Sequence, residues 1–505
     1  MLQNISKKLK WIKKNPKILK NIYKGIEREG LRINNKGKMS KKNYPKNMGY
    51  SLTNEWITTD FSENLLEIIT PKTNNNKYLL NFLHDIHKYI IKNIKPELIW
   101  PFSIPCKISN NKKIKLAKYG KSDIGLKKTL YRKGLQKRYG TLMNIVAGIH
   151  YNFSLPNKLL NLWIKKKIIK NKSEGYLNII RNYYRFGWII PYLFGSSPAI
   201  SKEYIKNEKI KFKNYKKKYD MIFLPWSTSL RLGQSFINKN NINNKNKIKF
   251  NSLKSYIKNL KKLLNTPCKN FKKIGLKDKK NILQQININI LQMESELYTQ
   301  IRPKRNTKKN ESLLKNLKKK GIEYIEIRSL DINPFSSIGI NKKQILILDI
   351  FLIWCFLKKS PKINNKELII INKNWKKIIF EGRKPKKKII NYFNNMKIKI
   401  KKINKKLYKD LIKIAKIFDI CFKNKKYTNA CKKFKKSFTN PKYTYSEFVI
   451  KFLLKKKGIH YSGLHLSNKY KKEFNKKKFK IINKKKFIIN KKKSIKKYIK
   501  INKKK

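Results

Sequence analysis

The chain has 505 residues, of which 40% are hydrophobic and 12% aromatic, which is enough apolar material for a large buried core and argues against a disordered protein. Its formal net charge of +100 would ordinarily indicate a nucleic-acid partner or an anionic membrane. The lysines, however, are spread along the whole chain together with many asparagines and isoleucines, the amino acids of A/T-only codons. We therefore expect the charge to reflect an AT-rich genome, because the sequence has no single basic segment interleaved with aromatics.

Neither an export signal nor a membrane span is expected from the hydrophobic pattern. The first segment, Met1–Leu19, carries scattered lysines and lacks an uninterrupted apolar run. The strongest apolar run, Ile345–Leu357, is shorter than the ~20 residues of a membrane helix and contains Asp349, so it predicts a buried core helix. The five cysteines are widely spaced and form no CxxC pair, which argues against a structural zinc site or a disulfide framework. We expect a soluble, cytoplasmic protein.

The spacing of apolar residues predicts the secondary structure in chain order. Alternating patterns predict strands at Gly25–Ile33, Asn64–Thr70, Gly148–Leu155, Ile286–Ile290 and Glu323–Ile332. Helical spacing predicts helices at Tyr78–Ile94, Tyr176–Phe186, Leu253–Leu264, Lys343–Leu357 and Leu407–Phe418. Groups of strands separated by long helical segments, without a regular βαβ rhythm, favour an α+β fold. Residues 238–248 and 466–505 are nearly pure Lys, Asn and Ile, which predicts a loop for the first and a poorly ordered or weakly packed tail for the second.

Acidic residues are rare, so the places where they gather are informative. The chain has only 27 of them, and nine of these form two clusters in predicted strands and the turns beside them. The first cluster holds Glu27, Glu29, Glu55, Asp60, Glu63 and Glu67, and the second holds Glu323, Glu326 and Asp331. A single acid in such a chain usually neutralises a nearby lysine. Clusters that persist in apolar strands while lysine spreads elsewhere favour a chemical role.

The alternation of side chains in a strand places some of these acids on a common face. In the segment GIEREGLR, Glu27 and Glu29 point the same way. Two carboxylates on one face repel each other and stay ionised only beside cations, for which oxygen-ligated Mg²⁺ is the ordinary solution. In EYIEIRS the same rule puts Glu326 and Arg328 on one face, as a metal ligand beside a phosphate-binding guanidinium. His150 lies on the polar face of its strand, where a metal ligand and an ordinary core histidine fit about equally.

The usual nucleotide-binding and hydrolase motifs are missing from the sequence. It has no GxxxxGK[ST], no GxGxxG after a strand, no GxSxG and no HExxH. If this protein uses ATP, it must therefore do so through carboxylate-held metal ions and arginines on a sheet.

At these same segments the sequence resembles the proteobacterial glutamate–cysteine ligases, also called γ-glutamylcysteine synthetases. The similar stretches follow the family's order over about residues 1 to 385, and the similarity thins after that. They are Gly25–Arg32, Trp56–Glu63, Leu130–Leu135, Arg138–Gly140, Gly148–Pro156, Arg181–Trp188, Pro191–Gly195, Thr228–Arg231, Ile301–Arg305, Gly321–Arg328 and Ser329–Phe335. The sequence departs from the family pattern at Asn144 and Val146, where the family has glutamine and isoleucine.

The resemblance implies a fold and a site. The fold would be a curved, largely antiparallel sheet that forms a funnel with helices outside, related to the catalytic domain of glutamine synthetase, within a catalytic domain that spans residues 1–465. The implied metal ligands are Glu27, Glu29, Asp60, Glu67, His150 and Glu326. Arg231 and Arg328 would contact the phosphate or substrate as catalytic residues. The cysteine pocket would be lined by Phe61, Tyr131, Leu135, Val146 and Tyr298.

The resemblance also implies the reaction. The γ-carboxylate of L-glutamate would attack ATP to give γ-glutamyl phosphate, which the amine of L-cysteine opens, in the first step of glutathione biosynthesis. Two or three Mg²⁺ ions and nearby guanidiniums would neutralise the reacting oxygens. We expect a monomer without a specific nucleic-acid or membrane partner. Two alternatives stay open, namely another ATP-dependent carboxylate–amine ligase on the same scaffold and a basic nucleic-acid-binding protein, which would present a contiguous basic face in place of an acid-lined cavity.

Overall fold

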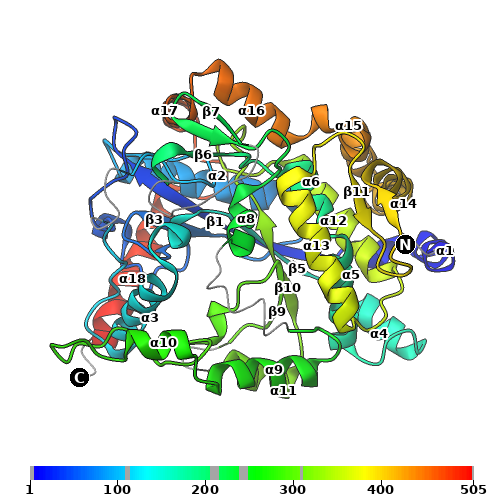
Figure 1. Ribbon diagram of the computed structural model, residues 1–505, viewed down its shortest axis with the longest axis horizontal. Helices are drawn as coiled ribbons and strands as arrows, with labels where there is room; N and C mark the ends of the chain where they lie inside the picture. Colours follow the sequence, from blue (N-terminus) through cyan, green and yellow to red (C-terminus); the bar gives the residue numbers. More distant parts are fainter. Residues whose placement is uncertain (1–4, 109–113, 205–214, 238–247, 308–310, 503–505) are drawn as a thin grey trace.

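The computed structural model describes residues 5–108, 114–204, 215–237, 248–307 and 311–502. A seven-stranded sheet lies at its centre (Figure 1). The strands of this main sheet are β1 (Tyr23–Ile33), β2 (Ile57–Thr59), β3 (Leu65–Ile69), β4 (Leu98–Ile99), β5 (Ile149–Ser154), β9 (Ile301–Lys304) and β10 (Tyr324–Leu330). Two small sheets are formed by β6 (Ala199–Ser201), β7 (Lys216–Lys218) and β8 (Met221–Phe223), and by β11 (Lys388–Ile390) and β12 (Lys397–Lys399).

The main sheet is antiparallel throughout. Its strands follow the order β2-β3-β1-β5-β10-β9, and β4 pairs with the end of β1. Four of the five strands predicted from the alternating patterns correspond to β1, β3, β5 and β10. The predicted α+β class with a largely antiparallel sheet is therefore confirmed.

Helices surround the sheet (Figure 1). Up to residue 265 they are α1 (Ser6–Lys14), α2 (Asn76–Asn93), α3 (Asp123–Tyr139), α4 (Asn157–Lys165), α5 (Lys172–Phe186), α6 (Ile189–Phe194), α8 (Leu230–Ile237) and α9 (Leu253–Asn265). After residue 265 they are α10 (Lys269–Ile274), α11 (Leu313–Lys320), α12 (Lys342–Leu357), α13 (Asn365–Glu381), α14 (Ile400–Phe422), α15 (Lys426–Thr439), α16 (Tyr445–Lys455), α17 (Ile459–Lys476) and α18 (Lys484–Asn502). The five predicted helices correspond to α2, α5, α9, α12 and part of α14.

Helix α12 forms the centre of the core behind the sheet. It begins with a capping box between Asn341 and Gln344, which satisfies the free amides of its first turn. All of its residues from Gln344 to Leu357 are buried, so the strongest apolar run is the core helix that the sequence predicts. Within it, Asp349 is paired with Lys24 at 2.6 Å and accepts a hydrogen bond from the hydroxyl of Tyr151 at 2.7 Å. These contacts join α12 to β1 and β5.

The prediction of a strand at Ile286–Ile290 is wrong. This segment belongs to no strand and forms one isolated bridge, between Asn289 and Pro267. Its backbone is satisfied locally, because the amide of Ile286 donates to the Gln292 side chain and Asn287 donates to the Gln292 carbonyl. Asparagine and glutamine side chains offer the backbone such alternatives to a ladder, which an apolar alternation does not reveal.

The C-terminal region also differs from the expectation of a weakly packed tail. Residues 459–476 and 484–502 form α17 and α18, and both helices bury residues against the rest of the protein. The Asp85 carboxylate accepts hydrogen bonds from the amides of Lys480, Ile481 and Ile482 between the two helices. The loop predicted at 238–248 falls almost entirely on residues 238–247, which lie outside the described residues.

Among the described residues, no helix has both the length and the apolar content that crossing a membrane requires.

Candidate active site

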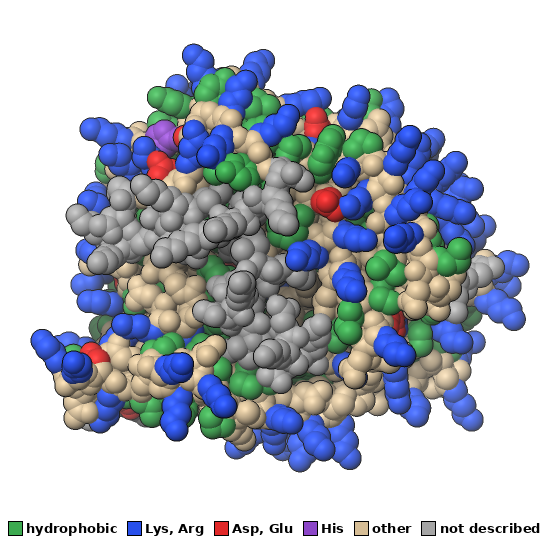
Figure 2. Space-filling model, in the orientation of Figure 1, with side chains coloured by type: hydrophobic (Ala, Val, Ile, Leu, Met, Phe, Trp, Pro, Cys, Tyr) green, Lys and Arg blue, Asp and Glu red, His purple; other side chains and the backbone are tan. Residues whose placement is uncertain are grey.

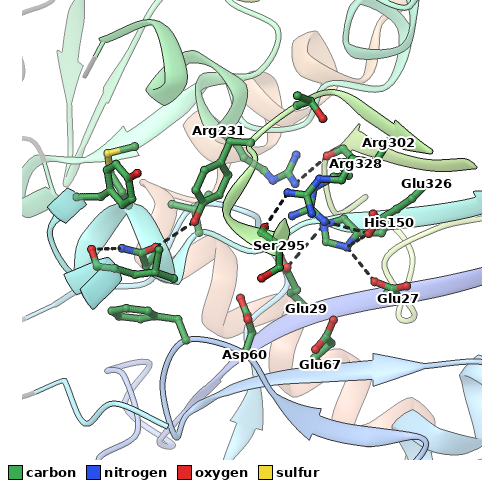
Figure 3. Close-up of a pocket in the computed structure, with 18 of the residues that line it drawn as sticks. Glu27, Glu29, Asp60, Glu67, His150, Arg231, Ser295, Arg302, Glu326 and Arg328 are labelled. Atoms are coloured by element: carbon green, nitrogen blue, oxygen red, sulfur yellow. Dashed lines mark hydrogen bonds and ion pairs between the residues drawn. The ribbon is translucent and has the colours of Figure 1, made fainter. Parts of the chain in front are cut away.

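A cavity of about 460 Å³ lies on the face of the main sheet that points away from α12. The orientation follows from β5, where Tyr151 points to Asp349 of α12 and its neighbours His150 and Asn152 therefore point to the other face. The cavity volume is in the range of small-molecule sites. All thirteen site residues predicted from the sequence line this cavity, and Figure 3 shows the charged ones gathered along the sheet.

The register of the strands explains why the charged side chains meet. Glu29 of β1 is paired with Glu67 of β3, and Glu27 of β1 is paired with His150 of β5. On the far side of β5, Glu326 of β10 is paired with Arg302 of β9. Directly opposed residues of an antiparallel pair share a face and lie close together. Five strands from different parts of the sequence therefore contribute to one row of charges.

Three of these residues form a group with the spacing of metal ligands. One ligand atom each from Glu27, His150 and Glu326 lie within 4.8 Å of one another. The His150 Nδ1 atom is 3.1 Å from Oε2 of Glu27 and 3.4 Å from Oε1 of Glu326, and its Nε2 atom is 3.7 Å from Oε1 of Glu29. The predicted convergence of these acids on His150 is thus present, and what they bind stays a prediction.

The acids of the cavity are not equally balanced by cations. Burial disfavours ionisation of all of them. For Glu67 it raises the pKa well above the usual value, and repulsion from Asp60 adds to this. For Glu29 burial also raises the pKa. Glu27 and Glu326 have lowered pKa values despite their burial, because His150 donates to Glu27 and because Arg328 and Lys304 lie beside Glu326.

Two arginines, Arg231 and Arg328, line the cavity beside the acids. Arg328 of β10 is paired with Glu326 at 2.9 Å, which raises the pKa of Arg328 although burial opposes its charge. Arg231, in the first turn of α8, donates to the Arg328 carbonyl at 3.1 Å and lies 3.7 Å from Asp331. A Cβ atom at Gly148 would lie 1.9 Å from the Arg231 guanidinium, so only glycine at this position leaves room for it.

The residues predicted to line the cysteine pocket form a less polar wall of the same cavity. They are Phe61, Tyr131, Leu135, Val146 and Tyr298. Phe61, Tyr131 and Leu135 are buried, whereas Tyr298 is 43% exposed and donates a hydrogen bond to Asn144 at 3.3 Å. Asn144, one of the two positions that depart from the family pattern, thus holds the edge of this wall.

Four further cations of the cavity were not predicted as site residues: Lys128, Arg132, Arg302 and Lys304. Arg132 of α3 is 3.5 Å from the Asp60 carboxylate and also donates to the Asp60 carbonyl. Lys304 is 3.5 Å from Glu326. Arginine is scarce in this lysine-rich chain. The positions of Arg132 and Arg302 could therefore have been singled out by residue type, although the spacing of apolar residues does not indicate them.

Four acids of the two sequence clusters lie outside the cavity, which corrects the interpretation that the clusters as a whole serve chemistry. Glu55 and Glu323 form ion pairs with Lys497 and Arg305 near the surface. The remaining two acids bind backbone amides or hydroxyl groups. Glu63 accepts from the amides of residues 44 and 118, and Asp331 accepts from the Ser196 amide and the Ser197 hydroxyl.

Comparison with known proteins decides the family. The sequence model of the family described as glutamate-cysteine ligase matches residues 9–378. The glutamate–cysteine ligase of Buchnera aphidicola from Acyrthosiphon pisum is 52% identical over 100% of this chain and 98% of its own. That of Serratia proteamaculans is 43% identical over 93% of this chain and 91% of its own. The chain belongs to the glutamate–cysteine ligase family. The family and the enzyme class predicted from the sequence, a ligase acting in the first step of glutathione biosynthesis, are confirmed.

Solved structures agree with this assignment. The crystal structure of glutamate–cysteine ligase from Francisella tularensis in complex with AMP superimposes with a TM-score of 0.90 at 30% identity, over 96% of this chain and 95% of that one. A bifunctional glutathione synthetase from Pasteurella multocida has a TM-score of 0.68 at 20% identity, over 94% of this chain and 54% of that one. The second likeness concerns the fold alone.

Proposed function

We propose that glutamate, ATP and cysteine meet in the cavity on the main sheet. The observation that supports this most is the order of charges across the sheet, from carboxylates on β1 and β3, through His150 on β5, to cations on β10 and β9. A γ-carboxylate and a triphosphate repel each other, so an enzyme that joins them needs cations where they meet and anionic groups that hold further cations.

Mg²⁺ fits the acidic side of the cavity. Glu27, His150 and Glu326 offer ligand atoms within 4.8 Å of one another, and the Oε2 atom of Glu326 accepts no hydrogen bond from the described residues. Oxygen-rich ligand sets suit Mg²⁺. We propose that two or three ions are held by Glu27, Glu29, Asp60, Glu67, His150 and Glu326. Bound there, they would neutralise the phosphate oxygens of ATP.

The reaction balances without a protein nucleophile. An oxygen of the glutamate γ-carboxylate forms a bond to the γ-phosphorus of ATP while the bond to ADP breaks, which gives γ-glutamyl phosphate. The cysteine amine then attacks the acyl carbon, phosphate leaves with the electron pair of the broken bond, and the amine gives up a proton. We expect Arg231 and Arg328 to donate hydrogen bonds to the transferring phosphoryl group, whose charge grows on its outer oxygens.

The wall of Phe61, Tyr131, Leu135, Val146 and Tyr298 suits the cysteine side chain. A small thiol side chain gains from contact with apolar and aromatic surface, and Phe61, Tyr131 and Leu135 are buried. The same wall could hold another small amino acid, which leaves a second ligase as the nearest alternative. The acid-lined cavity favours either ligase over a nucleic-acid-binding protein.

The shape of the main sheet, the extent of the catalytic unit, the cellular compartment and the oligomeric state are proposals as well. We propose that the main sheet forms a funnel related to the catalytic domain of glutamine synthetase, and that residues 1–465 carry the catalytic unit. All five cysteines are free, which agrees with a reducing cytoplasm. We further propose that the protein is a monomer, and its mass from size-exclusion chromatography with light scattering tests this.

One assay tests the proposed function. Purified protein is incubated with ATP, Mg²⁺, glutamate and cysteine, and γ-glutamylcysteine and ADP are measured. Formation of the dipeptide that requires each of the four components supports the proposal. The same assay with other small amines in place of cysteine separates the alternative ligase, because that enzyme would turn over another amine faster than cysteine.

A further inference from the structure

The C-terminal helix α18 lies against the outside of the cavity wall that carries the proposed cysteine pocket. In Figure 1 it runs beside α3, although the two helices are far apart along the chain. The ring of Tyr498 stacks on that of Tyr50 with centroids 3.7 Å apart and planes 3° apart. The Thr53 hydroxyl donates to the Ser494 carbonyl at 2.7 Å, and the amide of Tyr50 donates to the Ser494 hydroxyl at 3.0 Å. Helix α18 thus binds the segment that leads into β2.

The same helix also binds the segment that leads into α3. Gly120 has a φ of +96°, and a Cβ atom there would lie 2.3 Å from the Tyr498 hydroxyl. The close approach of Tyr498 to the backbone therefore requires glycine. Two residues later, the amide of Ser122, the N-cap of α3, donates to the Asn502 side chain at 2.9 Å. One helix thus contacts both chain segments that enter the wall.

These two segments carry three of the five residues of the wall. Phe61 follows β2, and α3 carries Tyr131 and Leu135. Tyr119, next to Gly120, ties the segments together, because its hydroxyl lies 2.8 and 2.9 Å from the carbonyl oxygens of Thr59 and Asp60. The Tyr119 ring in turn lies 4.5 Å beneath the guanidinium of Arg132.

The other end of α18 is anchored independently. The amides of residues 480–482 are held by Asp85. Phe487 packs between the rings of Trp56 and Tyr89, with centroid distances of 5.7 and 4.2 Å. By contrast, α18 makes no hydrogen bond or ion pair with β1, β5 or β10 within the described chain. Around the cavity, these contacts of α18 are therefore confined to the side that β2 and α3 form.

We propose that α18 positions the acceptor side of the active site, with Tyr498, Ser494 and Asn502 as positioning residues for the cysteine pocket. The inference rests on the proposed assignment of that wall to cysteine. When these contacts are lost, β2 and the start of α3 gain freedom, so ordering the wall around the acceptor costs more free energy on binding. The acids of β1 and β10, Glu27, Glu29 and Glu326, stay in place. The structure thereby assigns a binding role to a segment whose composition indicates only a basic tail.

The test compares steady-state constants of Tyr498→Ala, Ser494→Ala, Tyr498→Phe and the unaltered full chain. Ile499→Ala is the matched control, because Ile499 lies on the same helix and is 46% exposed. We expect Tyr498→Ala to raise the KM for cysteine by about tenfold, and Ser494→Ala to raise it less. Tyr498→Phe keeps the stacked ring and should restore most of the affinity. In all variants the KM for glutamate and the glutamate-dependent release of ADP without cysteine should change by less than about twofold.

Two outcomes would overturn the inference. An unchanged KM for cysteine in Tyr498→Ala would show that α18 does not order the wall. A parallel loss of cysteine affinity, glutamate affinity and ADP release, with a lowered melting temperature, would show that α18 supports only the overall fold. Failure of the proposed function looks different, because the unaltered chain would then ligate another amine or none.

Discussion

The cavity and the outer surface of this protein hold their charges in opposite ways. On the face of the molecule drawn in Figure 2, lysine and arginine side chains far outnumber acidic ones. At the surface, an ion pair such as Lys497–Glu55 joins two half-exposed side chains. Inside the cavity, Glu27, Glu326 and Arg328 are largely withdrawn from water and lie within about one hydrogen-bond length of a specific partner. Exposed pairs of the first kind contribute little to stability, whereas buried charges depend on their partners.

This difference between the surface and the cavity explains what the net charge of the chain does and does not indicate. The net charge of +100 describes the surface, where a lysine can replace another polar residue at little cost. The cavity does not follow that trend, because a lysine in place of Glu27 or Glu326 would leave cations facing one another in a buried site. A chain can therefore look like a nucleic-acid-binding protein in composition while its cavity keeps the charges of a ligase.

The largest expected effect is on turnover, in the cavity. Arg328→Lys keeps the positive charge but loses the two-pronged guanidinium that matches phosphate oxygens. We expect kcat to fall about 100-fold or more, with little change in the free energy of unfolding. Arg305→Lys is the control, since Arg305 pairs with Glu323 outside the cavity, and its kcat should stay within about twofold. A near-normal kcat for Arg328→Lys would mean that Arg328 only supports Glu326.

The next effect is stabilisation by Mg²⁺. If the acids of the cavity bind Mg²⁺ in the folded state only, the ion at 100 times its Kd raises the free energy of unfolding by about 2.7 kcal/mol. Denaturant unfolding with and without MgCl₂, at matched ionic strength, measures this. Glu27→Gln should remove most of the stabilisation, whereas Glu55→Gln, at the surface, should retain it. Equal stabilisation of both variants would place the bound Mg²⁺ outside the cavity.

A smaller effect concerns Glu67 and pH. Its pKa is raised in the folded protein, chiefly by burial, so the folded state holds the proton more tightly than the unfolded state. The resulting stability is complete below the ordinary glutamate pKa and is lost as the pH rises through the raised value. Without Mg²⁺, Glu67→Gln should therefore stabilise the protein by about 1 kcal/mol at pH 8, and by less near pH 5.

Unfolding midpoints at the two pH values measure this difference. Glu323→Gln is the control, because Glu323 lies outside the cavity and is partly exposed beside Arg305. Added Mg²⁺ should cancel the gain of Glu67→Gln, since the bound ion favours the ionised carboxylate. A gain that stays constant from pH 5 to pH 8 would mean that Glu67 is not protonated in the folded state at the lower pH.

The sequence predicted the strands of the site better than its cationic side. Alternation located β1, β3, β5 and β10, because each strand buries an apolar face against helices while its other face carries charges. Strand β9 was missed because it has only four residues, Ile301–Lys304, and contains Pro303. Of its two cations, Lys304 does not stand out in a chain rich in lysine.

Helix α18 was missed for a related physical reason. The residues that it buries are Phe487, Asn490 and Ser494, so much of its inner face is polar. A helix that attaches through hydrogen bonds and two separate aromatic side chains, Phe487 and Tyr498, shows no continuous apolar stripe. The role of Ser494 and Tyr498 becomes visible only from the segments that they contact, Gly49–Thr53 and Gly120–Ser122. No pattern within the sequence of α18 identifies these two residues.

The smallest expected effect belongs to the surface, and it separates the two kinds of charge in one experiment. A protein of this net charge binds polyanions to some degree, since the release of counterions drives any such contact. We expect weak binding to DNA without sequence preference, which falls steeply between about 50 and 200 mM salt. The ligase reaction should respond less over the same range, because the charges of the cavity are buried and screened less than exposed lysines.

The measurement follows fluorescence anisotropy of a labelled duplex and formation of γ-glutamylcysteine in the same sample during a salt titration. A second duplex of scrambled sequence controls for preference. DNA binding that is lost while ligation continues would show that the exposed lysines cause the DNA binding and take no part in the ligase reaction. The burial of Glu326 and the exposure of Lys497 agree with this expectation. Sequence-selective binding that persists at physiological salt, in a sample without ligase activity, would instead make the basic surface the functional part. The strand register that brings Glu27, His150 and Glu326 together argues against that outcome, because binding to DNA gives no reason to keep buried carboxylates beside a histidine.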